Sequence, residues 1–158
     1  MGTTGELAVR REVTVTAPVE RAFAVFTERF DAWWPRDFQI GEQSPEAFVL
    51  EPRAGGRWYE RAADGTECEW GEVLVWEPPG RLVLAWRIDG SWRYDPDLLT
   101  EVEVRFTGTG DGRTRVELEH RLFEGFGADA ARMSGTFGSD GGWSRVLAGY
   151  VAAAGVSG

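Results

Sequence analysis

The chain of 158 residues contains no lysine and no asparagine, and it has one cysteine, Cys68, and one histidine, His120. A single cysteine excludes an intrachain disulfide and any metal site built from clustered cysteines. A single histidine excludes metal sites that need two imidazoles. Without lysine the chain cannot form a Schiff base with a carbonyl substrate or with pyridoxal phosphate. We therefore expect no metal and no other cofactor.

Long apolar runs are also missing. No stretch approaches the roughly 20 apolar residues that a membrane-spanning helix requires, and the N-terminal sequence MGTTGELAVRREV has no hydrophobic signal core. The net charge is −9, from 26 acidic and 17 basic residues. Such a surface repels phosphate backbones and anionic lipids. We expect a cytoplasmic protein that binds no nucleic acid and does not insert into membranes.

The sequence contains enough hydrophobic residues to form a core, because 42% of its residues are hydrophobic and eight are tryptophan. This length and composition predict a single domain over residues 1–158, with its core over about 7–154. Residues 1–5 and 155–158 are expected to form irregular ends.

Hydrophobic periodicity predicts an α+β fold. Residues 7–16 alternate as a strand does, and residues 18–30 have the apolar face of a helix, which Trp33-Trp34-Pro35 ends. A second helix is predicted over 143–154, with Asp140 as its N-cap. Tight turns join the other strands, which implies an antiparallel sheet that curls around the last helix. These six strands are predicted over 48–51, 57–61, 67–77, 81–88, 101–107 and 114–121.

The order and spacing of several short motifs resemble the START-like superfamily, also called SRPBCC, and within it the activators of heat shock protein 90 ATPase. The motifs are Ala17-Pro18-Val19-Glu20-Arg21-Ala22-Phe23, Trp33-Trp34-Pro35, Glu51-Pro52-Arg53-Ala54-Gly55-Gly56-Arg57-Trp58, Asp64-Gly65, Gly71-Glu72-Val73, Glu77-Pro78-Pro79, Leu82-Val83-Leu84-Ala85-Trp86, Thr114-Arg115-Val116-Glu117-Leu118-Glu119-His120 and Gly142-Trp143-Ser144.

This resemblance implies a helix-grip fold, in which a curled seven-stranded antiparallel sheet surrounds a long C-terminal helix. It also implies a cavity between sheet and helix. Members of the superfamily bind lipids, hormones or polyketides, some catalyse cyclisation, and the chaperone activators dock on a partner protein. The fold alone does not determine which of these functions the protein has.

Strand alternation assigns side chains to the concave face of the sheet. It places Glu60, Glu69 and His120 there, among tryptophans, and it places Trp70 and Trp76 on the other face. Buried carboxylates are costly unless they are paired. The glutamates therefore either pair with an arginine such as Arg121 or Arg132, anchor a ligand, or act as acid and base with His120. A lone inward histidine is more often a structural group than a catalytic one.

The predicted ligand-binding residues combine this polar set with aromatic and aliphatic side chains. The loop over 89–100, with Trp92 and Tyr94, is a candidate lid. The full set of predicted ligand-binding residues is Trp34, Trp58, Glu60, Glu69, Trp86, Phe106, Leu118, His120 and Trp143.

Three functions follow from these features. The first is binding of a small apolar molecule, aromatic or lipid-like, in the cavity. The second is an enzyme, a cyclase, aromatase or hydrolase that uses Glu60, Glu69 and His120. The third is an interaction module that activates a chaperone ATPase. A homodimer is compatible with each of them.

Overall fold

The computed structural model of the protein describes residues 7–155, so the predicted irregular ends lie outside it except for Gly155. Its centre is one antiparallel sheet of seven strands in the order β1-β7-β6-β5-β4-β3-β2. The first strand of the chain therefore pairs with the last. The strands are β1 (Val9–Val15), β2 (Pro45–Leu50), β3 (Arg57–Ala62), β4 (Glu67–Glu77), β5 (Arg81–Trp86), β6 (Thr100–Gly108) and β7 (Thr114–Arg121).

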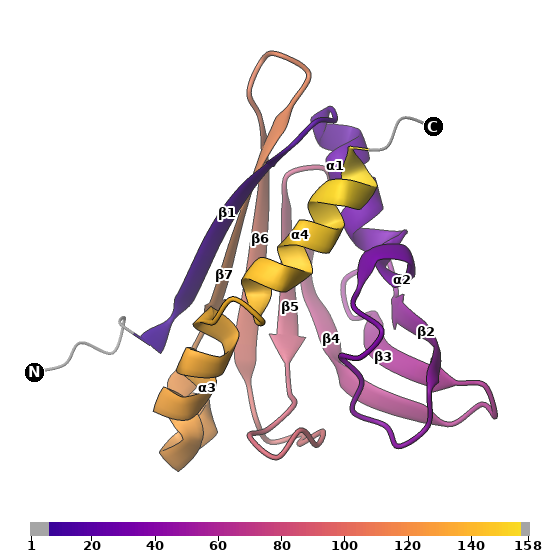
Figure 1. The fold of residues 1–158 in the computed structure, drawn as a ribbon, viewed down its shortest axis with the longest axis vertical. Helices are drawn as coiled ribbons and strands as arrows, with labels where there is room; N and C mark the ends of the chain where they lie inside the picture. The colour runs from indigo at the N-terminus through magenta and orange to yellow at the C-terminus, as the bar shows by residue number, and fades with distance from the viewer. Residues whose placement is uncertain (1–6, 156–158) are drawn as a thin grey trace, which may run out of the picture.

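Helices cover the concave face of this sheet (Figure 1). The segment after β1 forms α1 (Val19–Thr27) and the short α2 (Phe30–Trp33), and the chain after β7 forms a 3₁₀ segment, η2 (Phe123–Asp129), then α3 (Ala130–Gly138) and α4 (Trp143–Ala154). Figure 1 shows α4 crossing in front of the strands, with α3 at one of its ends and α1 at the other. The predicted helix-grip fold is confirmed. Within residues 7–155, every helix is too short or too polar to span a bilayer.

The C-terminal helix is held by its apolar face. Val146, Leu147 and Tyr150 are buried, and the Tyr150 hydroxyl donates to the carbonyl of Ala22 on α1 at 2.7 Å. The predicted N-cap, Asp140, is wrong. The N-cap is Gly142, whose close packing against the end of α3 leaves no room for a side chain, since a Cβ there would lie 2.3 Å from the Phe137 carbonyl oxygen.

The first helices follow the predicted pattern with one break. Phe23 and Phe26 of α1 pack edge-on against Phe106 of β6, at centroid distances of 5.1 and 5.7 Å. The predicted single helix is divided into α1 and α2. As predicted, the helical segment ends at Trp33, because Trp34 precedes a proline and takes an extended conformation.

Two irregularities in β4 overturn part of the predicted alternation. The register with β3 shifts between Trp58 and Tyr59, and the register with β5 shifts between Val73 and Val75. Each shift adds one unpaired residue to β4 and reverses the faces beyond it. Trp70 is consequently buried on the concave side, and Trp76 packs there against Phe23 at 5.0 Å. The prediction that these tryptophans face outward is wrong.

Candidate functional site: an aromatic cavity between sheet and helix

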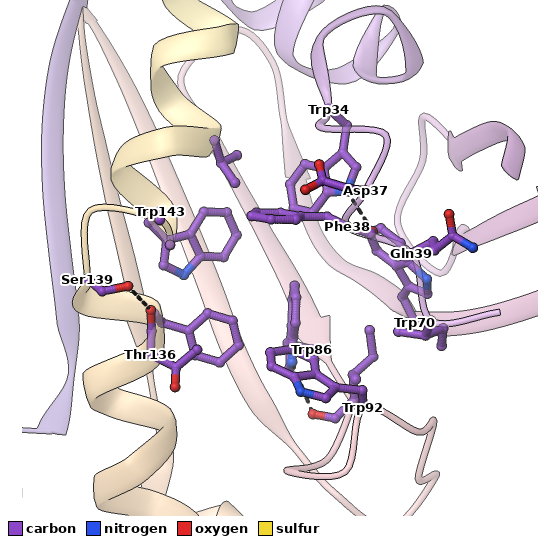
Figure 2. Close-up of a pocket in the computed structure, with 16 residues that line it drawn as sticks. Trp34, Asp37, Phe38, Gln39, Trp70, Trp86, Trp92, Thr136, Ser139 and Trp143 are labelled. Atoms are coloured by element: carbon purple, nitrogen blue, oxygen red, sulfur yellow. Dashed lines mark hydrogen bonds between the residues drawn. The ribbon is translucent and has the colours of Figure 1, made fainter. Parts of the chain in front are cut away.

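A cavity of about 410 Å³ lies between the concave face of the sheet and the helices α3 and α4. Four parts of the chain form its wall: the segment after α2, strands β4 and β5, the loop after β5, and the region from α3 to α4 (Figure 2). Aromatic side chains dominate the wall. They are Trp34, Phe38, Trp70, Trp86, Trp92, Phe137 and Trp143.

The buried tryptophans of the wall do not offer their indole N–H groups to the cavity. Each donates to a protein acceptor at 3.0–3.3 Å, so a bound molecule would meet ring surfaces rather than hydrogen-bond donors. These four bonds join Trp34 to the Phe38 carbonyl, Trp70 to Glu60 Oε1, Trp86 to the Ile88 carbonyl, and Trp143 to His120 Nδ1.

His120 belongs to a buried chain of hydrogen bonds behind the wall. Its Nδ1 accepts from Trp143, and its Nε2 lies 2.9 Å from the hydroxyl of Thr100, which itself donates to the Trp86 carbonyl at 2.9 Å. These partners require a neutral imidazole with its proton on Nε2. Burial lowers the pKa of His120 from 6.5 to about 3. His120 is fully buried and is not part of the cavity wall, so the structure places it as a structural group.

Glu60 points inward as predicted, but the expected arginine is not its partner. The carboxylate is buried and accepts three hydrogen bonds, from the backbone N–H groups of Ile40 and Gly41 and from the indole of Trp70. No ion pair to Glu60 occurs among residues 7–155. Glu60 lies behind the wall and does not line the cavity.

Glu69 lies on the convex face of the sheet, which contradicts the predicted inward position. The register shift next to Trp70 reverses the alternation at this point, and Glu69 pairs with Arg57 on the outer surface. The predicted acid–base set of Glu60, Glu69 and His120 is therefore divided between two faces. None of the three lines the cavity, so this set cannot act together on a molecule bound there.

The other predicted ligand-binding residues fall into two groups. Trp34, Trp86 and Trp143 lie in the cavity wall. The second group is buried but lies outside the wall, and it consists of Trp58, Phe106 and Leu118. Trp58 supports the wall from behind, at centroid distances of 5.4 Å from Trp70 and 5.6 Å from Trp86.

Sequence reasoning missed several residues of the wall. Phe38 and Ile40 lie between α2 and β2, in a stretch without periodicity, and Trp70 was assigned to the wrong face. Phe137 belongs to α3, in which no ligand-binding residue was predicted. Of the two aromatic residues in the loop predicted as a lid, Trp92 lines the cavity and Tyr94 does not.

One ion pair stands at the solvent edge of the cavity. Both guanidinium nitrogens Nη1 and Nη2 of Arg145 on α4 contact the carboxylate of Asp37, at 3.0 and 2.7 Å. The hydrogen bonds from Arg145 lower the pKa of Asp37. The guanidinium also lies 4.7 Å from the ring centroid of Phe38. Asp37 and Phe38 line the cavity, so Arg145 joins one wall of the cavity to α4.

Comparisons with known proteins agree with this architecture. A sequence model of the family described as "Activator of Hsp90 ATPase homolog 1-like protein" matches residues 16–154. No curated protein matches the chain.

Two solved structures are similar over nearly their whole length. Txn09, an anthrahydroquino-γ-pyrone synthase solved in complex with SUM, is 40% identical, with a TM-score of 0.65; the match covers 92% of this chain and 96% of Txn09. CalC from Micromonospora echinospora, a self-sacrificing resistance protein, is 35% identical, with a TM-score of 0.70 and 93% of each chain covered.

Proposed function

The chain belongs to the family of activator of Hsp90 ATPase homolog 1-like proteins, and we propose that it binds a flat, polycyclic aromatic molecule in the cavity between the sheet and α4. The observation that carries the proposal is the cavity itself. Its volume of about 410 Å³ falls within the range of roughly 300–1,000 Å³ that is usual for small-molecule sites. Seven aromatic side chains line it, and such rings attract other rings through offset and edge-on contacts.

The chemistry of the wall supports an aromatic ligand over a strongly polar one. The four buried indole N–H groups are already bonded within the protein, and among the described residues of the wall Asp37 carries the one carboxylate. A ligand therefore gains most of its binding energy from burying flat apolar surface. Its polar groups are best placed toward the solvent edge near Asp37.

The named activity of Txn09 supports the same class of molecule. An anthrahydroquino-γ-pyrone is a fused aromatic ring system, and Txn09 is 40% identical to this chain over 96% of its own length. This identity also favours a second candidate function, catalysis on such a ring system. A ring-forming reaction would be detected by mass spectrometry, as a product whose formation requires the protein. Activation of a chaperone ATPase, a homodimer and a cytoplasmic location stay predictions.

Isothermal titration with 2,6-dihydroxyanthraquinone tests the binding proposal. We expect saturable binding at one site per chain. Val146→Phe places a ring into the cavity and should weaken binding at least about tenfold. Val151→Phe is the matched control, since Val151 lies on the same helix but outside the wall. Binding that Val146→Phe leaves unchanged would contradict the cavity as the site, and no binding by a panel of such ring systems would contradict the function.

A further inference from the structure

One wall of the cavity is a segment without regular secondary structure. Residues 35–44 connect α2 to β2, and Asp37, Phe38, Gln39 and Ile40 of this segment line the cavity. A strand or helix is held in place by its own backbone hydrogen bonds, whereas such a segment depends on the contacts of a few residues. Within the segment, the Gln39 side chain donates to the carbonyls of Gly41 and Gln43, but the attachment of the segment to the sheet depends on groups outside it.

Glu60 is the buried group to which this segment is attached. Its Oε1 accepts from the Ile40 N–H at 2.6 Å, and its Oε2 accepts from the Gly41 N–H at 3.1 Å. The same Oε1 accepts from the Trp70 indole at 3.0 Å. Only 3% of Glu60 is exposed, so these three donors replace the water that the carboxylate loses on folding.

The residue at position 41 fits this attachment. A Cβ on Gly41 would lie 3.0 Å from Glu60 Oε2 and 3.1 Å from the Cys68 sulfur. The absence of a side chain at this position allows the backbone to approach the carboxylate closely enough for its N–H to bond. The sequence thus supplies both the acceptor and the space in which the segment reaches it.

We infer that Glu60 is a positioning residue of the cavity, whose buried carboxylate holds the 35–44 segment and the Trp70 ring in the arrangement that a ligand meets. The inference rests on the proposed binding function. Glu60 does not touch the ligand in this role, because it lies behind the wall. It acts through Ile40 of this segment and Trp70 of β4, which both line the cavity.

The test compares Glu60→Gln with Glu69→Gln. The control makes the same substitution on the neighbouring strand, on the convex face. Glutamine at position 60 keeps the shape of the side chain, but its NH₂ group faces a backbone N–H and cannot accept from it. Two quantities are measured for each protein: amide hydrogen exchange at Ile40 and Gly41, and the Kd for 2,6-dihydroxyanthraquinone.

We expect Glu60→Gln to speed exchange about tenfold at the amide that the NH₂ group faces, and to raise the Kd about tenfold, since each change corresponds to the loss of one buried hydrogen bond. Glu69→Gln should change neither quantity more than about twofold. Unchanged exchange, or faster exchange with an unchanged Kd, would overturn the inference and leave the proposed function intact.

The same measurements also distinguish failure of the proposed function from failure of the Glu60→Gln variant to fold. If the wild-type protein binds no aromatic ligand, the proposed function fails, and the exchange rates alone decide whether Glu60 holds the wall. If Glu60→Gln does not fold, Glu60→Asp takes its place, since it keeps the charge and shortens the reach. Ile40 and Gly41 amides that exchange in the wild type as fast as in an unstructured peptide would also overturn the inference.

Discussion

The indole N–H of Trp143 donates to Nδ1 of His120 at 3.1 Å, and this bond links α4 to β7 at the back of the cavity. The other ring nitrogen lies 2.9 Å from the hydroxyl of Thr100 on β6. Since that hydroxyl donates to the Trp86 carbonyl, two tryptophans of the cavity wall are joined through one neutral histidine. Three strands and a helix meet at this chain of bonds.

Removal of the Thr100 hydroxyl should destabilise the protein. In Thr100→Val the side chain keeps its shape, but the Nε2–H of His120 loses its acceptor in a buried site. We expect the free energy of unfolding to fall by about 1–3 kcal/mol in urea denaturation. Thr107→Val is the matched control, because Thr107 lies exposed on the same strand, and it should change stability by less than about 0.5 kcal/mol. Equal effects of the two substitutions would contradict the assigned network.

The buried histidine should make stability depend on pH in a defined window. Burial lowers the pKa of His120 from 6.5 to about 3, so below pH 6.5 the unfolded chain takes up a proton that the folded protein excludes. Stability is therefore complete above pH 6.5 and falls as the pH falls toward 3, by up to about 1.4 kcal/mol per pH unit.

The buried carboxylate of Glu103 contributes to the pH dependence only at lower pH. Burial opposes the ionisation of Glu103, but hydrogen bonds from Arg81, Arg121 and Arg105 outweigh it and lower the pKa from 4.5 to about 2. Its contribution is present above pH 4.5 and is lost below it. Urea unfolding between pH 6.5 and 5 thus isolates the histidine. His120→Gln should show a flat profile there, and a slope equal to that of the wild type would assign the effect to other groups.

Trp92 should contribute to ligand affinity and not to folding. It lines the cavity while 43% of its surface is exposed, and its ring lies 6.0 Å from that of Phe137. We expect Trp92→Ala to raise the Kd for the aromatic ligand by about tenfold and to change the free energy of unfolding by less than about 0.5 kcal/mol. Tyr94→Ala is the control, since Tyr94 has similar exposure outside the wall. Similar losses of affinity in both variants would refute a specific role for Trp92.

Strand alternation was sufficient to predict most of the sheet, and it failed where the backbone departs from regular pairing. In β7, which pairs without a shift, it correctly placed His120 inward. β4 contains one extra residue relative to β3 and one relative to β5. Where these extra residues fall depends on how β4 pairs with its neighbours, and the sequence of β4 alone does not show this. Glu69 and Trp70 were consequently assigned to the wrong faces.

The partners of Glu60 could not be predicted for a different reason. From the sequence, a buried carboxylate is expected to pair with an arginine, because charged side chains can be read directly from the sequence. The actual donors are two backbone N–H groups and an indole. Every residue except proline carries a backbone N–H, so only the path of the 35–44 segment identifies which two reach Glu60.

The Asp37–Arg145 pair should control how fast a ligand enters and leaves. Both side chains are well exposed, at 65% and 46%, so the pair contributes little to stability, yet it joins the 35–44 segment to α4 at the edge of the cavity. We expect Arg145→Gln to increase the association and dissociation rates several-fold in stopped-flow tryptophan fluorescence. Raising the salt concentration to about 1 M should produce the same increase in the wild type and little in the variant, because salt screens exposed ion pairs.

Arg10→Gln, which breaks the exposed pair with Glu119, is the control and should leave both rates unchanged. Rates that respond equally to salt in the wild type and in Arg145→Gln would show that the pair does not limit access to the cavity.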